Sequence, residues 1–262
     1  MSTFATLRGS QARAAAEAGP EIKWGVLMGR RRLISLGAAA VLAVVVAIQT
    51  VLSSTGPSML LAEADLPTVT AGVDVLAGVP VVPVRVRHGD YRRAAFGEAW
   101  TDDTDAPGGH NQCDTRNDIL DRDLIDKTYV AISRCPRAAT GVLHDPYTST
   151  TVNFQRGNKT GAAIQIEHIV PLAYSWDQGA WSWPESLRVR FANDPANLLA
   201  VQGQANQDKG DKQPALWMPP NAAFHCQYAM QFIAVVRGYG LAVDEPSVPV
   251  LRDAAATCPS SR

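Results

Sequence analysis

The feature that most constrains this chain is an uncharged apolar run, Leu33–Leu52, which directly follows three arginines, Arg30, Arg31 and Arg32. A basic cluster followed by an apolar run is typical of an export signal or a membrane anchor. The run is close to the length that spans a bilayer, so a cleaved signal peptide and a retained anchor both stay open. A buried core helix is the alternative, but such a helix is seldom apolar on every face.

This run divides the chain into three parts. We expect residues 1–52 to be a leader, with the signal peptide or membrane anchor at residues 33–52, and Met28 is an alternative start that would give a conventional short basic region. Residues 53–80 are rich in Ser, Thr, Pro and Gly and are predicted to form a flexible linker. Residues 81–262 are long enough to fold as one domain with its own core.

All the cysteines lie beyond the apolar run, at Cys113, Cys135, Cys226 and Cys258. An even count in an exported chain indicates disulfides, and we favour the local pairings Cys113–Cys135 and Cys226–Cys258. Zinc ligation is the alternative, although no C-x-x-C pair is present. These observations place the domain outside the cell or on the outer face of the cytoplasmic membrane.

The charge of the chain argues against one class of function. The chain has 24 basic and 25 acidic residues, and because its first 64 residues carry more basic than acidic side chains, the remainder carries an excess of acid. Proteins that bind nucleic acid tightly through counterion release usually have a broad basic surface. The composition therefore disfavours a high-affinity, sequence-reading DNA-binding protein, but it allows an enzyme that binds transiently at a local cationic cleft.

Hydrophobic spacing and turn residues predict a mixed α+β fold. The predicted helices are residues 117–127, 171–177, 185–191, 203–209, 224–237 and 248–257. The predicted strands are residues 151–154, 163–167 and 197–201.

One constellation carries candidate chemistry. Glu167 and His168 end a predicted strand, Asn197 follows at the start of the next strand, and Asn206 lies on the helix after it. A histidine with a near-neutral pKa can take the proton of an attacking water. A carboxylate and an amide oxygen are ligands for a hard divalent cation, which stabilises a phosphate and its leaving oxygen. This pattern fits hydrolysis of a phosphodiester bond, provided that the strand bends at its end so that Glu167 and His168 share one site.

Two basic residues are candidates for phosphate binding. Lys209 lies one turn after Asn206, and Arg116 lies near Cys113. A solvated surface role is the alternative for Lys209, and pairing with Asp114 or Asp118 is the alternative for Arg116.

The ordered set resembles the HNH (ββα-metal) endonucleases, in particular the exported bacterial branch similar to the GmrSD C-terminal domain. The strings that carry this resemblance are IEHIVPL, FANDPANLLAV and NQDKGD, with flanking FGEAW, CDTRNDIL, DPYT and KGDKQPALWMPP. It covers the chain roughly from Tyr91 to Cys258. Glu167 stands where the resemblance leads us to expect Asp, which lengthens the ligand by one methylene, and Ser149 stands where Gly is commoner.

The resemblance implies a role for each residue. His168 would be the general base, Glu167 and Asn206 would hold the metal, and Asn197 would be the orienting residue of the catalytic set. The metal would be Mg²⁺, with Mn²⁺ as a substitute, and the substrate would be DNA or also RNA, cut with low sequence specificity. The fold would be a small ββα core within residues 163–212, wrapped by helices and stapled by two disulfides.

Two other functions remain open at this stage. The first is a catalytically silent binding module, exported or anchored, on the same scaffold; the presence of both His168 and Asn206 counts against it. The second is a metallohydrolase of another class, such as a cell-wall peptidase, for which a zinc signature such as H-E-x-x-H would be expected and is missing from the sequence. We expect a monomer whose partner is nucleic acid, with a membrane contact only if the leader is retained.

Overall fold

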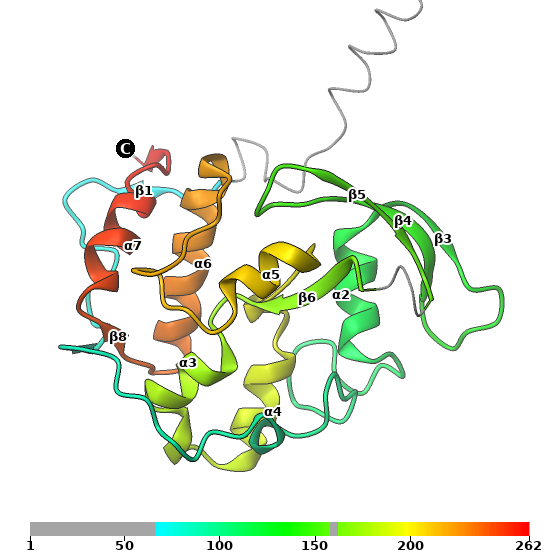
Figure 1. The fold of residues 1–262 in the computed structure, drawn as a ribbon, viewed down its shortest axis with the longest axis horizontal. Helices are drawn as coiled ribbons and strands as arrows, with labels where there is room; N and C mark the ends of the chain where they lie inside the picture. Colours follow the sequence, from blue (N-terminus) through cyan, green and yellow to red (C-terminus); the bar gives the residue numbers. More distant parts are fainter. Residues whose placement is uncertain (1–65, 158–161, 262) are drawn as a thin grey trace, which may run out of the picture. The chain divides into compact units, whose positions relative to one another are not determined.

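The computed structural model describes residues 66–157 and 162–261. Short sheets and helices alternate along this part of the chain (Figure 1), which confirms the predicted α+β class. The predicted leader and its apolar run at residues 33–52 lie outside the described residues. Within the described ranges, no helix combines the length and the apolar character needed to cross a bilayer.

The element that positions the candidate site is a two-stranded antiparallel sheet followed at once by a helix. Strand β6 (Ile164–His168) pairs with β7 (Leu198–Gln202), and α5 (Gly203–Lys209) begins at the next residue. Gly203 makes this sharp transition possible, because a Cβ there would lie 2.5 Å from the carbonyl oxygen of Ala162. Figure 1 shows α5 directly beside β6. The two strands and the helix predicted for this region are confirmed.

A second sheet has three antiparallel strands, β3 (Ile125–Tyr129), β4 (Ala138–His144) and β5 (Thr151–Gln155), in that order. It packs with α2 (Thr115–Asp123) and the β6–β7 pair around a small core. The side chains at the centre of this core are Ile119, Leu120, Leu143, Phe154, Ile166 and Leu198.

The prediction of one helix over residues 117–127 was wrong at both ends. The N-cap is Asp114, whose carboxylate accepts a hydrogen bond from the Asn117 amide at 2.9 Å. The helix ends at Asp123, because Leu124 adopts extended backbone angles and the chain continues as β3.

The larger core lies on the other side of the β6–β7 pair and is built from helices and aromatic rings. Its helices are α3 (Leu172–Asp177), α4 (Glu185–Asn193), α6 (His225–Gly238) and α7 (Ser247–Ala255). Single 3₁₀ turns cover Arg93–Phe96 (η2), Ala180–Ser182 (η3), Pro195–Asn197 (η4) and Ala222–Phe224 (η5). Buried rings fill the space between them, namely Phe96, Tyr147, Tyr174, Phe191, Phe224, Tyr228 and Phe232.

Two short parallel pairs tie the beginning of the domain to its end. Strand β1 (Val69–Thr70) pairs with β9 (Ser260–Ser261), and β2 (Val81–Val82) pairs with β8 (Val243–Asp244). Between them, Leu76 and Val79 are buried in the larger core. The described part of the predicted linker, residues 66–80, is therefore packed against the domain, which begins earlier than Val81.

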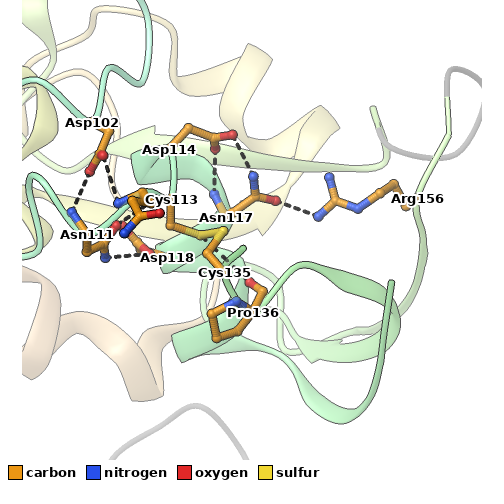
Figure 2. Close-up of a disulfide and its surroundings, with 10 residues drawn as sticks. Asp102, Asn111, Cys113, Asp114, Asn117, Asp118, Cys135, Pro136 and Arg156 are labelled. Atoms are coloured by element: carbon orange, nitrogen blue, oxygen red, sulfur yellow. Dashed lines mark hydrogen bonds between the residues drawn. A yellow bond between two sulfur atoms is a disulfide. The ribbon is translucent and has the colours of Figure 1, made fainter. Parts of the chain in front are cut away.

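Both disulfides follow the favoured pairing. Cys113 and Cys135 have Cα atoms 5.4 Å apart and join the start of α2 to the loop between β3 and β4 (Figure 2). Cys226 and Cys258, with Cα atoms 4.9 Å apart, join α6 to the chain that follows α7. The structure therefore leaves no described cysteine free for zinc.

Around the first disulfide, the preceding loop is fixed by side-chain hydrogen bonds to its backbone (Figure 2). The Asp102 carboxylate accepts hydrogen bonds from the amides of Asn111 and Gln112 at 2.9 and 2.8 Å. Asn111 in turn accepts from the Cys113 amide at 2.7 Å. These bonds hold the loop between Trp100 and α2, the helix on which Arg116 lies.

Candidate active site

A cleft of about 820 Å³ opens where β6 ends. Its walls come from residues 87–93, Trp100, β6 and the beginning of α3, and α5 closes one side. Four residues predicted from the sequence line this cleft, namely Arg116, Glu167, His168 and Asn206. The other two, Asn197 and Lys209, are fully buried and lie outside its lining.

The His168 side chain is held from two directions. Its Nε2 lies 2.9 Å from the carbonyl oxygen of Ala192, and its ring stacks on the Trp100 indole with centroids 5.4 Å apart and planes 11° apart. A carbonyl accepts but cannot donate, so Nε2 carries the proton and Nδ1 carries the lone pair. Burial lowers the pKa of His168 to about 3, against the smaller raising effect of the Ala192 carbonyl. The imidazole is therefore neutral and has its lone pair at Nδ1, and its pKa lies well below the near-neutral value expected from the sequence.

Glu167 forms a buried ion pair with Lys209. The Lys209 ammonium also donates to the carbonyl oxygens of His168 at 2.8 Å and of Ile169 at 3.1 Å. Burial raises the pKa of Glu167, although the Lys209 charge opposes this, and burial lowers the pKa of Lys209. The lysine thus compensates the Glu167 charge and fixes the chain where β6 ends.

This arrangement corrects both sequence-based readings of Lys209. Its side chain has 0% exposure, so it is neither a solvated surface lysine nor in a position to contact a substrate phosphate. The reason is physical: three buried oxygen acceptors at the end of β6 need donors, and one ammonium group satisfies all of them.

Asn197 acts on the backbone after His168 rather than on the imidazole. Its side-chain oxygen accepts from the Val170 amide at 2.8 Å, and its side-chain nitrogen donates to the Val170 carbonyl at 3.3 Å. Its own carbonyl accepts from the Ile169 amide at 2.9 Å. Asn197 therefore orients the loop after His168, which agrees with the orienting role that the resemblance implies.

The donors that could hold a cation are oxygens. The Asn206 side-chain nitrogen donates to the Gln165 side chain at 2.8 Å, so its carbonyl oxygen is the atom suited to coordination. In the described ranges, no group of three His, Cys, Asp or Glu side chains is arranged to bind a metal. Mg²⁺ retains water ligands and takes one or two protein oxygens together with substrate phosphates. Glu167 and Asn206 fit that pattern.

Charge in the cleft is distributed unevenly. Glu167 is paired with Lys209, Asp177 with Arg85 at 2.7 Å, and Asp211 with Arg85 at 3.0 Å and Arg87 at 2.5 Å. The three carboxylates that line the cleft therefore have basic partners of their own. Two further arginines, Arg93 and Arg116, also line it. A local cationic cleft thus exists in a domain with an excess of acidic residues.

Sequence reasoning gave no role to two residues of this cleft, Trp100 and Arg93. Trp100 ends the string FGEAW, and Arg93 lies three residues before that string. The resemblance of FGEAW was the only signal that pointed to this segment.

Arg116, which was predicted, donates to the Ile164 carbonyl at 3.0 Å, and burial lowers its pKa. It therefore supports β6 while lining the cleft.

Comparison with known proteins identifies the family of the chain. Residues 114–246 match the family model described as "GmrSD restriction endonucleases, C-terminal domain". A protein of Arthroderma benhamiae, described as an "Uncharacterized secreted protein", is 32% identical over 196 residues, covering 74% of this chain and 88% of the relative. No solved structure shows a significant match. The chain belongs to the family of GmrSD restriction endonuclease C-terminal domains.

Proposed function

We propose that this protein is an exported, metal-dependent HNH endonuclease that hydrolyses phosphodiester bonds, with His168 as its general base. The observation that carries the proposal is the common cleft of Glu167, His168 and Asn206, in which burial keeps the imidazole neutral and the Ala192 carbonyl holds its Nε2. The restriction endonuclease family supports a nuclease activity and a nucleic acid substrate.

The reaction needs one proton acceptor at the attacking water. Nδ1 of His168 takes a proton from the water as its oxygen forms a bond to phosphorus, and the bond from phosphorus to the leaving 3′ oxygen breaks. The leaving oxygen is then protonated by solvent, and the imidazolium returns its proton to water. General-base catalysis of this kind contributes about 10²–10⁴ in rate.

Glu167 and Asn206 would hold the divalent cation, Mg²⁺ or Mn²⁺ in its place, with waters and substrate oxygens completing the coordination. When bound, the cation supplies positive charge to the phosphate and to the leaving oxygen. The chain contributes the orientation: Lys209 fixes the Glu167 carboxylate, and Asn197 fixes the loop after His168.

The substrate that we propose is DNA, with RNA as a second substrate, cut with low sequence specificity by a monomer. The two disulfides and the description of the relative as secreted support an extracellular location, or one on the outer face of the cytoplasmic membrane if the leader is retained. A silent binding module on the same scaffold is the rival, and the intact set of cleft residues weighs against it.

A plasmid assay tests the proposal. The oxidised full-length protein is incubated with supercoiled plasmid in Mg²⁺, in Mn²⁺ and in EDTA, beside H168A and the matched control H144A. His144 suits the control because it contacts Thr151 on the second sheet and does not line the cleft. We expect nicking by the wild type and H144A only with metal, and nicking about 10²–10⁴ times slower by H168A. Intact plasmid under all conditions, with a folded wild type and intact RNA in a parallel assay, would favour the binding module.

A further inference from the structure

We infer that Arg93 binds a backbone phosphate of the substrate and takes the role that the sequence suggested for Lys209. This inference rests on the proposed nuclease function and identifies the residue through which the cleft would hold its polyanionic ligand. Arg93 lines the cleft with an exposed side chain.

Arg93 differs from the other cleft arginines in its partners. Arg87 is paired with Asp211, and Arg116 is half-buried and donates to a backbone carbonyl. In the described part of the chain, the side chain of Arg93 has no carboxylate partner, and its recorded contact is with the Trp100 ring, whose centroid lies 5.9 Å from its guanidinium carbon. An arginine without a carboxylate partner retains its full charge and its donor fork for a phosphate.

The backbone that carries Arg93 is fixed on both sides. The Asp177 carboxylate accepts from the His88 amide at 2.8 Å, and Trp176 donates to Asp90 at 3.0 Å. After Arg93, Phe96 is 2% exposed and Arg188 donates to the Ala95 carbonyl at 2.7 Å. The guanidinium is therefore presented on an ordered turn, which lowers the entropy cost of binding.

Arg93 and the candidate base His168 contact the same ring, that of Trp100. The Trp100 ring contacts both the Arg93 guanidinium and the His168 imidazole, and the Arg93 charge acts on both Glu167 and His168. A phosphate bound by Arg93 would therefore lie in the same cleft as the candidate base. The binding energy comes from one charge-assisted contact with the sugar–phosphate backbone, which carries no sequence information.

The test is DNA binding measured separately from cleavage. A fluorescently labelled DNA duplex is titrated in EDTA with the full-length wild type, R93Q, R93K and R92Q, at several salt concentrations. Arg92 is the matched control because it is the adjacent exposed arginine and does not line the cleft. Circular dichroism and thermal unfolding of each variant confirm folding.

We expect R93Q to weaken binding about tenfold or more and to reduce the slope of log K against log salt by about 0.9. R93K should recover part of the affinity, and R92Q should bind like the wild type. Equal effects of R92Q and R93Q, or wild-type binding by R93Q, would overturn the inference.

Cleavage assays separate this inference from the proposed function. Arg93-dependent binding by a wild type that does not cleave would uphold the role of Arg93 and overturn the nuclease. Cleavage by a wild type whose binding and activity do not depend on Arg93 would uphold the nuclease alone. A wild type that neither binds nor cleaves would overturn both.

Discussion

The imidazole of His168 lies parallel to the indole of Trp100, with the ring centroids 5.4 Å apart. The same imidazole is tethered at Nε2 by the Ala192 carbonyl. One contact fixes the plane of the ring and the other fixes its rotation, so that Nδ1 has one defined direction. A general base acts only when its lone pair lies within hydrogen-bond reach of the water.

Trp100 is therefore a positioning residue for His168. We predict that W100A lowers kcat at least tenfold with little change in KM, because the substrate still binds while the base loses its support. W100F should retain more activity, since a smaller ring can still stack. NMR of the His168 ring should show a changed environment in W100A. A W100A enzyme with wild-type kcat and an unchanged His168 signal would contradict this role.

The buried pair of Glu167 and Lys209 predicts a large effect on stability. Removing one partner of a buried ion pair leaves the other charge uncompensated and typically costs about 3–5 kcal/mol. K209M should therefore lower the free energy of unfolding by about that amount in urea denaturation, because Glu167 and two carbonyls lose their donor. Lys212 is the matched control, since it is exposed, and K212M should change stability by less than about 0.5 kcal/mol. Similar losses in both variants would refute the buried role.

The disulfide between Cys226 and Cys258 encloses a segment with a sequence separation of 32 residues that contains most of α6 and all of α7. Loss of a native disulfide from a secreted domain typically costs about 2–5 kcal/mol. We predict that C226S/C258S lowers the free energy of unfolding by this amount, measured in urea without reductant. Nuclease activity at low temperature should persist, because neither cysteine lines the cleft. Unchanged stability would mean that packing of α6 and α7 alone fixes this end of the chain.

Asp211, which lines the cleft, makes the free energy of unfolding depend on pH. Burial raises the pKa of Asp211, but hydrogen bonds and charge from Arg87 and Arg85 outweigh it and leave the pKa below its ordinary value of 3.8. A pKa lower in the folded than in the unfolded state gives stability that is present above the unfolded value and is lost as the pH falls through the folded one. We predict that wild type loses stability relative to D211N as the pH falls below about 4. Parallel acid-unfolding curves for the two proteins would contradict this.

The sequence predicted the β6–β7–α5 region well because chemistry and periodicity agree there. Short apolar strands are bounded by Pro171 and Gly203, and the polar candidates follow directly. The strand β3 was missed because Leu124 and Ile125 continue the apolar spacing of α2, so that local periodicity could not show where the helix ends. Pairing with β4, a contact distant in sequence, decides the conformation of residues 125–129.

The sequence was enough to predict several residues of the candidate site, but not the contacts that those residues make. His168, Glu167 and Asn206 follow from the ordered motif, and the structure places them in one cleft. The burial of Lys209 could not be inferred, because lysines are solvated by default and only the folded chain brings three acceptors to one point. Trp100 and Arg93 reach the cleft through tertiary packing of residues 88–100, which no local pattern indicates.

The central claim is that His168 is the general base, and single-turnover cleavage tests it most directly. Wild type, H168A and H144A, each in excess over a labelled DNA duplex, are mixed with Mg²⁺, and the binding affinity of each is measured in EDTA. We predict that H168A binds the duplex as wild type does but cleaves it about 10²–10⁴ times more slowly, whereas H144A matches wild type in both. Cleavage by folded H168A at the wild-type rate would contradict the claim and assign proton transfer to another group in the cleft.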